Sequence, residues 1–464
     1  MEQQEVENQK GSIKKGNPIV DLAAPCRLGK GILQLEENER EKWRRKGSKT
    51  SSQLACFIPA SGSGSRMFQF LFDYLEKKET VDQGKVEHFL NNLEDFAFFR
   101  FLPIDMQSDI KSGQYSPENI IRFILGKEGL NLASMPKGMV PFHLVKPFVL
   151  NAFQEQYVQA SQLIGPRGEV HFTIQEEFME DIRNSLMHAQ ASTGLQQKVS
   201  YSYQDKKQAA YAFDGDMELA KDKSGQLIRR PAGHGALISN LNRVEADLIL
   251  VKNIDNVQHL DKSGLSKSTW LELIGLTEDI QQKLNKLLAN FSRESALQFN
   301  HKFQLYDQEE FEKATDQQQI ELLNRPLRIC GMVKNIGQPG GGPYWIREES
   351  GLSKQIVEKA QMQNSDEQQA LVVKSTHFNP VMMVLSTKNN KGDKFDFTKY
   401  VDEEKYFIVN KSHEGQEIVY RELPGLWNGA MAKWNTVFVE VDSDTFSPVK
   451  SILDLLSPQH TPQI

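Results

Sequence analysis

Short apolar runs alternate with helical patterns along most of this chain of 464 residues. Residues 54–58 and 247–252 are short apolar runs next to turn residues, which is typical of buried strands. Residues 169–174 alternate between apolar and polar side chains, as a strand does. Strands that alternate with helices favour a sheet covered by helices. The pattern therefore predicts an α/β fold, a three-layer α/β/α sandwich around a mainly parallel, mixed sheet.

The remaining segments complete this prediction. Further strands are expected at 199–203, 209–213, 327–333, 371–373, 407–409 and 437–441, and helices at 33–47, 82–100, 117–127, 146–163, 175–190 and 447–456. Residues 1–16 lack the apolar side chains that offset the entropy of ordering, so we expect a disordered tail. Residues 17–456 are predicted to form one large domain with a helical insertion at 265–322, followed by a polar tail at 457–464.

Charge and composition exclude several classes of protein. The chain has 55 Lys and Arg against 61 Asp and Glu, a net charge of −6, so it lacks the basic footprint of a general nucleic-acid binder. Its apolar runs are far shorter than a membrane helix, and its N-terminus has no signal-peptide core. The three cysteines are widely spaced, which favours a reduced cytoplasm without a cysteine-based zinc site.

A glycine- and serine-rich turn links the first predicted strand to a helix. We call it the glycine loop; it comprises Pro59, Ala60, Ser61, Gly62, Ser63, Gly64 and Ser65. Its glycines can adopt positive φ and allow close approach to a ligand, and its N–H groups attract anions. Arg66 can add a charge-assisted contact. The loop matches neither a Walker nor a Rossmann signature, so it is either a phosphate-binding loop or an ordinary turn.

A second candidate follows the strand predicted at 247–252, which delivers Asn253, Asp255 and Asn256. A carboxylate just past the end of a buried parallel strand lies at the edge where α/β sheets bind ligands. Mg²⁺ prefers one or two carboxylates together with phosphate oxygens, so Asp255 could hold Mg²⁺. The alternative is a turn-forming Asx residue.

Five motifs, in this order, carry a resemblance to a known family. PASGSGSRM is similar to the glycine-rich signature of the UDP-glucose and UDP-N-acetylhexosamine pyrophosphorylases, with Ser65 where Thr is usual. MPKG at 135–138 resembles their lysine-containing segment. PAGHG at 231–235 and NIDN at 253–256 resemble their Pro-Gly-His-Gly and Asn-x-Asp-Asn motifs, and FSPVK at 446–450 resembles their Phe-x-Pro-(Val or Leu)-Lys segment. KNIGQPGGGPYWI, THFNPV and ELPGLWNGAMAKWN are more similar to a bacterial family known only as a domain of unknown function.

The resemblance implies a nucleotidyltransferase-type fold and a Mg²⁺-dependent reaction between a nucleoside triphosphate and a sugar 1-phosphate, giving a nucleotide sugar and pyrophosphate. It implies catalytic roles for Arg66, Lys137, Asp255 and Lys450, with Asp255 as metal ligand. The resemblance also implies that the nucleotide is bound by the glycine loop and by Gln204, Gly233, His234 and Gly235. The sugar would contact Gly340, Gly341 and Glu358, the last resembling the glutamate of a Val-Val-Glu strand.

Two other functions stay open at this point. Asp214-Gly215-Asp216 has the Asp-x-Asp form of a metal-dependent glycosyltransferase, although Asp-Gly is also a strong hairpin-turn dipeptide. A protein that binds a nucleotide sugar without turnover is the second alternative. The sequence does not specify the base, the sugar or the oligomeric state.

Overall fold

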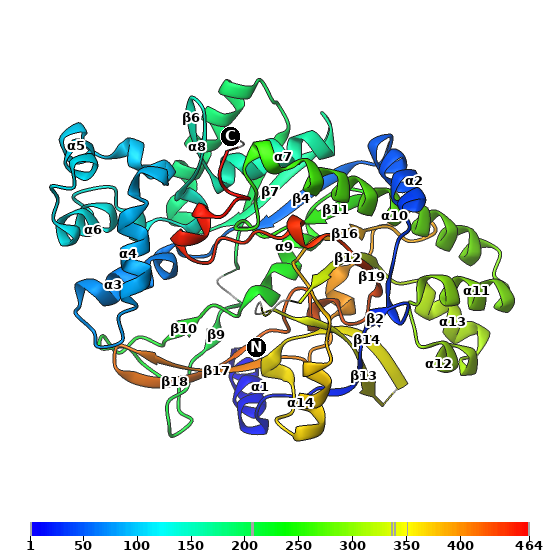
Figure 1. Ribbon diagram of the computed structural model, residues 1–464. Coiled ribbons are helices and arrows are strands. Elements are labelled where there is room, and N and C mark those ends of the chain that lie inside the picture. The colour runs from blue at the N-terminus through cyan, green and yellow to red at the C-terminus, as the bar shows by residue number, and fades with distance from the viewer. Residues whose placement is uncertain (1, 206–207, 336, 338–339, 350, 463–464) are drawn as a thin grey trace. The chain divides into compact units, whose positions relative to one another are not determined.

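The computed structural model describes residues 2–205, 208–335, 337, 340–349 and 351–462 and shows a mixed α/β architecture (Figure 1). The chain forms two compact units where the sequence suggests one expanded domain. Unit 1 comprises Met1–Gln53, Tyr203–Val251 and Leu271–Ser443. Unit 2 comprises Leu54–Ser202, Lys252–Trp270 and Asp444–Ile464. Each unit is assembled from three separate stretches of sequence, which explains why no linker marks a boundary.

Unit 2 is built on the parallel strands β4 (Leu54–Pro59) and β7 (Glu169–Ile174), with β8 (Lys198–Tyr203) next to β7. Helix α7 (Ala152–Ile164) packs against β4, β7 and helix α8 (Met179–Thr193). Strands β5 (Pro141–Val145) and β6 (Phe148–Asn151) form an antiparallel pair. The unit also contains α3 (Gln69–Leu75), α4 (Gln83–Asn91), α5 (Ile104–Ser112) and α6 (Pro117–Leu125).

Unit 1 contains a mixed sheet in the order β2, β3, β19, β12, β16, β11. The pairs β2–β3, β3–β19 and β12–β19 are parallel, whereas β16 is antiparallel to both neighbours. The expected mixed α/β fold is therefore confirmed. These strands span Arg27–Leu28, Gly31–Leu33, Asn435–Glu440, Leu327–Lys334, Met383–Ser386 and Leu248–Val251, respectively.

Smaller elements surround this sheet in unit 1. Strands β1 (Asp21–Pro25), β13 (Gly342–Glu348) and β14 (Gly351–Val357) form a separate antiparallel sheet. Strands β9 (Ala210–Tyr211) and β10 (Arg229–Arg230) form one antiparallel pair, and β17 (Phe407–His413) and β18 (Gln416–Glu422) form another. Strand β15 (His377–Phe378) pairs with β12. The remaining helices include α2 (Glu37–Ser48) and α9 (Ile238–Asn242).

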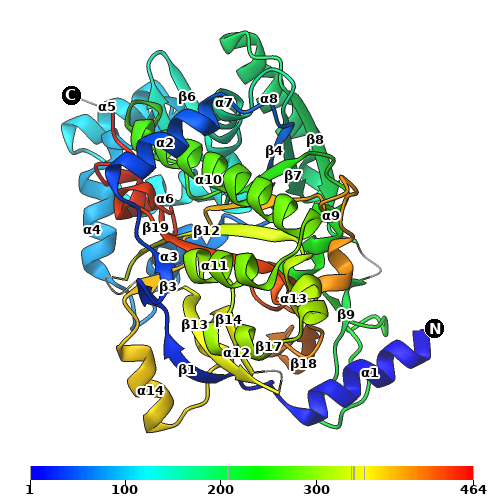
Figure 2. The ribbon, with the colours of Figure 1, turned by 90° about the vertical axis from the view of Figure 1, so that its right-hand side faces the viewer.

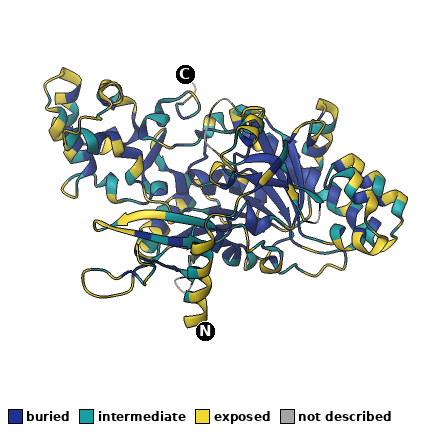
Figure 3. Ribbon diagram, turned by 90° about the horizontal axis from the view of Figure 1, so that it is seen from below, coloured by how far each residue is buried: buried dark blue, intermediate teal, exposed yellow. Residues whose placement is uncertain are grey.

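The expectation of a disordered N-terminal tail is wrong, because Glu2–Lys15 forms helix α1. Its outer face is exposed (Figure 3), but Gln9 and Ile13 are buried. The Gln9 side chain accepts a hydrogen bond from the backbone N–H of Tyr211 at 2.9 Å, and Ile13 packs with Tyr211 and Phe213. A few contacts to a preformed surface thus order a helix whose own composition is polar.

One other local expectation needs correction. Residues 371–373 lie in helix α14 (Asp366–Val373), because a three-residue apolar run cannot by itself separate strand from helix. The polar tail is anchored over its described part: His460 is buried, and the carbonyl of Gln459 accepts a hydrogen bond from the N–H of His259 at 3.0 Å.

The region expected as a helical insertion contains α10 (Gly264–Ala289), α11 (Arg293–Phe303), α12 (Gln308–Lys313) and α13 (Asp316–Leu323). Helices α11, α12 and α13 lie side by side in both views (Figures 1 and 2). Among the described helices, none combines the length and apolar character needed to cross a membrane.

Candidate functional site

The centre of the candidate site in unit 2 is the carboxylate of Asp255. Its Oδ2 atom accepts a hydrogen bond from Lys137 Nζ at 2.6 Å and another from Lys450 Nζ at 2.9 Å. These lysines lie 118 and 195 residues from Asp255 in the sequence. The fold therefore brings together three of the four predicted catalytic residues, which we call the Lys–Asp–Lys cluster.

Burial makes the Lys–Asp–Lys cluster electrostatically strong. The side chains of Asp255 and Lys137 are 9% and 14% exposed, whereas that of Lys450 is 61% exposed. Burial by itself would raise the pKa of Asp255, but the two ammonium groups outweigh it and lower that pKa. For Lys137, burial outweighs the attraction of Asp255 and lowers the pKa of the amine. Asp255 is thus held ionised, and Lys450 offers the solvent-facing charge.

Backbone hydrogen bonds hold the Lys450 segment beside Asp255. Val449 N–H donates to the carbonyl of Asp255 at 3.0 Å, and Ser447 N–H donates to Asn256 Oδ1 at 2.9 Å. Lys450 N–H donates to Asp454 Oδ2 at 2.6 Å, at the start of the 3₁₀ helix Ile452–Leu456. The backbone of residues 447–450 is therefore held where the Lys450 side chain reaches Asp255.

The glycine loop joins the Lys–Asp–Lys cluster through the Lys137 segment. Gly64 N–H donates to the carbonyl of Met135, and Lys137 N–H donates to the carbonyl of Gly62, each at 3.0 Å. Neither glycine has positive φ, contrary to expectation. Gly64 is required for close packing instead, since a Cβ there would lie 2.9 Å from the carbonyl oxygen of Met135. A Cβ on Gly62 would meet open space.

Arg66 is the fourth predicted catalytic residue. It is exposed on the 3₁₀ helix Ser65–Phe68, directly after the glycine loop, and its guanidinium makes no hydrogen bond or ion pair to the described residues. The hydroxyls of Ser63 and Ser65 lie 3.0 Å apart. With Lys137 and Lys450, Arg66 gives this region three cationic side chains, beside the carboxylates of Asp255 and Asp454.

The donor set limits how a metal could bind. Within the described residues, no group of three His, Cys, Asp or Glu side chains could hold a metal ion. Asp255 supplies one carboxylate, and its Oδ2 is already bonded to two ammonium groups. A magnesium ion fits here only if a substrate supplies phosphate oxygens, which is the coordination that Mg²⁺ commonly adopts.

The residues expected to contact a base lie in unit 1. Gln204 Nε2 donates to the carbonyl of Gly233 at 3.1 Å. Gly233 has φ +76°, which favours glycine, and a Cβ on Gly235 would lie 2.0 Å from the carbonyl oxygen of Pro424. Both glycines are thus needed for the turn to exist. That requirement explains their presence without any ligand.

His234 has a fixed orientation within this turn. Its ring stacks on Trp427, with centroids 4.5 Å apart, and its Nδ1 accepts a hydrogen bond from Leu426 N–H at 2.9 Å. Burial lowers the pKa of His234 to about 4, so the ring is neutral and carries its proton on Nε2. That nitrogen lies 4.0 Å from Glu358 Oε1.

Glu358 directly follows strand β14, as expected of a residue at the end of a strand. Burial, and then the charge of Glu422, raise the pKa of its carboxyl group. Gly341 is close to this region, because a Cβ on it would lie 3.5 Å from Glu358 Cγ. Gly340 instead packs against Phe378. Sequence reasoning missed Trp427 and Glu422; the signal available for Trp427 was an aromatic residue in the glycine-rich stretch PGLWNG.

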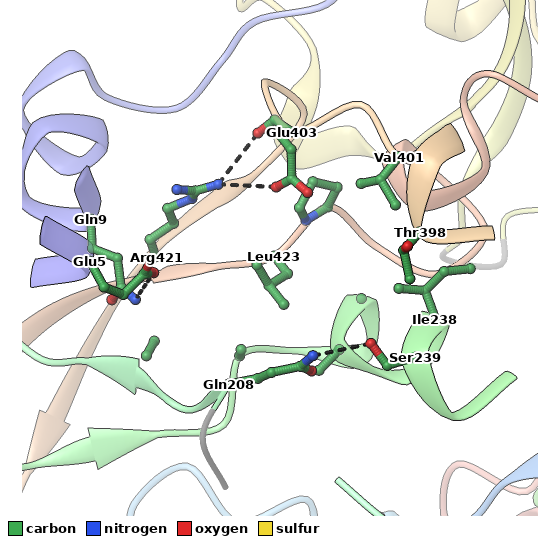
Figure 4. A pocket seen from close by; sticks show the side chains of 15 residues that line it. Glu5, Gln9, Gln208, Ile238, Ser239, Thr398, Val401, Glu403, Arg421 and Leu423 are labelled. Carbon is green, nitrogen blue, oxygen red and sulfur yellow. Dashed lines mark hydrogen bonds and ion pairs between the residues drawn. The ribbon is translucent and has the colours of Figure 1, made fainter. Parts of the chain in front are cut away.

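A pocket of about 470 Å³ lies on unit 1 beside the Gly235 turn (Figure 4). Its walls include Ala236, Ile238 and Leu423, with Gln208 and Ser239 joined by a hydrogen bond of 3.1 Å. Arg421 crosses it toward Glu403, and Glu5 and Gln9 of helix α1 complete one side. No motif or pattern in the sequence indicates this pocket.

Asp214 and Asp216 form a turn. Asp214 Oδ1 accepts hydrogen bonds from the N–H groups of Asp216 and Glu218, each at 3.0 Å. Asp214 N–H donates to the carbonyl of Glu218 at 2.9 Å, which closes the turn. The carboxylate that an Asp-x-Asp metal site would use is therefore engaged by its own backbone.

Fold and site define a mixed α/β protein with a lysine-rich cluster around one buried aspartate. The chain belongs to the family described as domain of unknown function DUF4301, whose model matches residues 1–461. Among curated proteins there is no match. One similar solved structure is described as UDP-glucose phosphorylase from Trypanosoma brucei; the likeness has a TM-score of 0.44 and 12% identity, and covers 96% of this chain and 72% of that one.

Proposed function

We propose that this protein transfers a nucleotidyl group from a nucleoside triphosphate to a sugar 1-phosphate and releases pyrophosphate. The observation that carries the proposal is the Lys–Asp–Lys cluster. Its lysines and aspartate are the residues that the pyrophosphorylase resemblance selects from three distant segments. The backbone pairing of the glycine loop with the Lys137 segment supports the same proposal.

The chemistry needs charge neutralisation and positioning. A phosphate oxygen of the sugar phosphate attacks the α-phosphorus in line, the bond from that phosphorus to the bridging oxygen breaks, and pyrophosphate leaves with the bond electrons. The attacking oxygen is already ionised, so no general base is required. Lys450 and Lys137 would stabilise charge on the transferring group, while Arg66 and the N–H groups of the glycine loop would bind the β- and γ-phosphates.

Mg²⁺ is proposed as the cofactor, held by Asp255 together with phosphate oxygens of the substrate. When bound, it would neutralise charge on the phosphates and fix their orientation. In the structure the two lysines occupy Asp255 Oδ2. Arrival of a polyanion gives both ammonium groups an alternative partner, which would free the carboxylate.

The resemblance assigns the remaining recognition to residues of unit 1. The base would contact Gln204 and the turn Gly233, His234 and Gly235, and the sugar would contact Gly340, Gly341 and Glu358. The fixed tautomer of His234 supplies one N–H donor, and Glu358 supplies an acceptor for hydroxyl groups. These assignments can be tested independently of the cluster.

The test is a panel of nucleoside triphosphates against sugar 1-phosphates with Mg²⁺, followed by analysis of the products. Release of pyrophosphate with formation of a nucleotide sugar is the expected result. Release of a nucleoside diphosphate would indicate glycosyl transfer, which the engaged Asp214 carboxylate disfavours. Tight binding of nucleotide sugars, together with no turnover of any triphosphate and sugar 1-phosphate pair, would contradict the proposal and favour a binding protein.

A further inference from the structure

A chain of buried side chains connects the C-terminal segment to the segment that carries Lys450. His143 Nδ1 lies 2.9 Å from Glu155 Oε1, and His143 Nε2 lies 2.8 Å from His460 Nδ1. His460 Nε2 lies 3.0 Å from the carbonyl oxygen of Ser447. The side chains of His143 and Glu155 are fully buried. We call these residues the histidine chain; all of them belong to unit 2.

The direction of each hydrogen bond follows from the last one. A carbonyl oxygen can only accept, so His460 carries a proton on Nε2. A neutral His460 then accepts at Nδ1, which requires His143 to donate from Nε2. A neutral His143 must in turn accept at Nδ1, so Glu155 donates from a protonated carboxyl group. The other carboxyl oxygen, Glu155 Oε2, accepts from Gln159 Nε2 at 2.9 Å.

Burial favours this neutral arrangement. It lowers the pKa values of His143 and His460 to about 3 each, and raises the pKa of Glu155 to about 8. The titratable and charged groups that face the chain are His259, Asp261, Lys252 and Asp454. Around neutral pH every link of the histidine chain thus has one donor and one acceptor.

The chain ends three residues before Lys450. Ser447, which receives the last hydrogen bond, also donates its N–H to Asn256 Oδ1 at 2.9 Å. Two residues further on, Val449 N–H donates to the carbonyl of Asp255. Helix α7, which carries Glu155, also binds the loop of Asp255 directly, since Gln156 Nε2 donates to the carbonyl of Asn253 at 2.9 Å. One helix therefore supports both partners of the Lys450–Asp255 ion pair.

We propose that His460 is a positioning residue, which through His143 and Glu155 fixes residues 446–450 and so places the Lys450 ammonium on Asp255. This inference rests on the proposed function for its catalytic consequence, but the ordering of residues 446–450 can be measured without any substrate. Without the chain, the Ser447 carbonyl would lose the donor that His460 supplies, while the segment would keep its bonds to the Asp255 loop and to Asp454.

The experiment compares the full-length protein with His460→Phe and Glu155→Gln. His460→Phe removes both hydrogen bonds while keeping a ring of similar size. Glu155→Gln is the matched control, because its amide can donate to His143 Nδ1 and still accept from Gln159. Two readouts at pH 7 are hydrogen exchange of residues 446–451, followed by mass spectrometry, and the affinity for inorganic pyrophosphate by calorimetry.

We expect His460→Phe to speed exchange of residues 446–451 by about tenfold and to weaken pyrophosphate binding by a similar factor, with Glu155→Gln close to the parent protein. A folded His460→Phe protein with parental exchange and affinity would overturn the inference. Faster exchange in a protein whose parent binds no pyrophosphate would support the positioning role and count against the proposed function.

A pH series keeps the inference testable if His460→Phe does not fold. Ionisation of Glu155 removes the proton that this carboxyl group donates to His143 Nδ1. The donor and acceptor roles along the histidine chain then no longer match. The parent protein should therefore show faster exchange of residues 446–451 above pH 8, after correction for intrinsic rates, and Glu155→Gln should not. Identical pH profiles of the two folded proteins would overturn the proposal.

Discussion

At the scale of single residues, one carboxylate oxygen organises the proposed site. Asp255 Oδ2 accepts a hydrogen bond from each lysine, but the two side chains differ in exposure: that of Lys137 is 14% exposed and that of Lys450 is 61% exposed. Asp255 and Lys137 form a buried pair whose rupture leaves an uncompensated charge. Lys450 can leave Asp255 at little cost and is therefore the lysine best able to follow a substrate phosphate.

A substitution of Lys450 tests this division of roles. Lys450→Met should leave the free energy of unfolding within about 0.5 kcal/mol of the parent value, because an exposed side chain is replaced. Turnover should fall by about two to three orders of magnitude, as for removal of one transition-state donor. Kinetics of pyrophosphate release and urea unfolding give the two quantities.

Lys127→Met is the matched control, since Lys127 is an exposed lysine of unit 2 outside the proposed site. It should change neither quantity. A Lys450→Met enzyme as active as the Lys127→Met enzyme would return Lys450 to the role of a surface lysine.

At the scale of elements, the two glycines of the glycine loop have different tasks. Gly64 packs against the backbone of Met135, whereas Gly62 faces open space. Gly64 is therefore needed for the packing of the loop, whereas Gly62 leaves space in which a ligand could bind.

Alanine substitutions should separate these tasks. Gly64→Ala should destabilise the protein by about 1–3 kcal/mol, because its Cβ must displace a backbone carbonyl. Gly62→Ala should keep the stability within about 0.5 kcal/mol but weaken binding of inorganic pyrophosphate, since a methyl group enters the space that the phosphate would use. Urea unfolding and calorimetry measure the two effects; equal losses of stability would contradict this assignment.

The elements also show what sequence could predict. Strand β4, the glycine loop and the lysines proposed to be catalytic follow from local patterns and from motifs that keep a fixed order. The histidine chain could not be predicted, because His143 and His460 are 317 residues apart and meet only through packing. Helix α1 was missed for a similar reason: its polar composition hides the contacts of Gln9 and Ile13 with the rest of unit 1.

At the scale of the whole molecule, the histidine chain couples stability to pH. His143 and His460, with pKa values of about 3, stay neutral where unfolded histidines are charged, so stability rises as pH increases from about 3 to about 6.5. Glu155, with a pKa of about 8, keeps a proton that the unfolded chain has lost, so stability falls as pH increases from about 4.3 to about 8. The sum is greatest near pH 6.5.

Glu155→Gln should remove the alkaline part of this dependence. Between pH 6.5 and 8.5 we expect the parent protein to lose roughly 2 kcal/mol of unfolding free energy relative to Glu155→Gln. Urea unfolding at both pH values measures this difference. If both proteins lose the same unfolding free energy between these pH values, groups other than Glu155 cause the loss of stability at alkaline pH.

The proposal that Asp255 and its lysines perform nucleotidyl transfer can be tested with a single substitution. Asp255→Asn keeps the size of the side chain but removes the charge that binds both lysines and the proposed Mg²⁺. With the best substrate pair and saturating Mg²⁺, initial rates of pyrophosphate release should fall by at least about two orders of magnitude in a protein with an unchanged circular dichroism spectrum. A folded Asp255→Asn protein that releases pyrophosphate at the parental rate would contradict a role of Asp255 in nucleotidyl transfer.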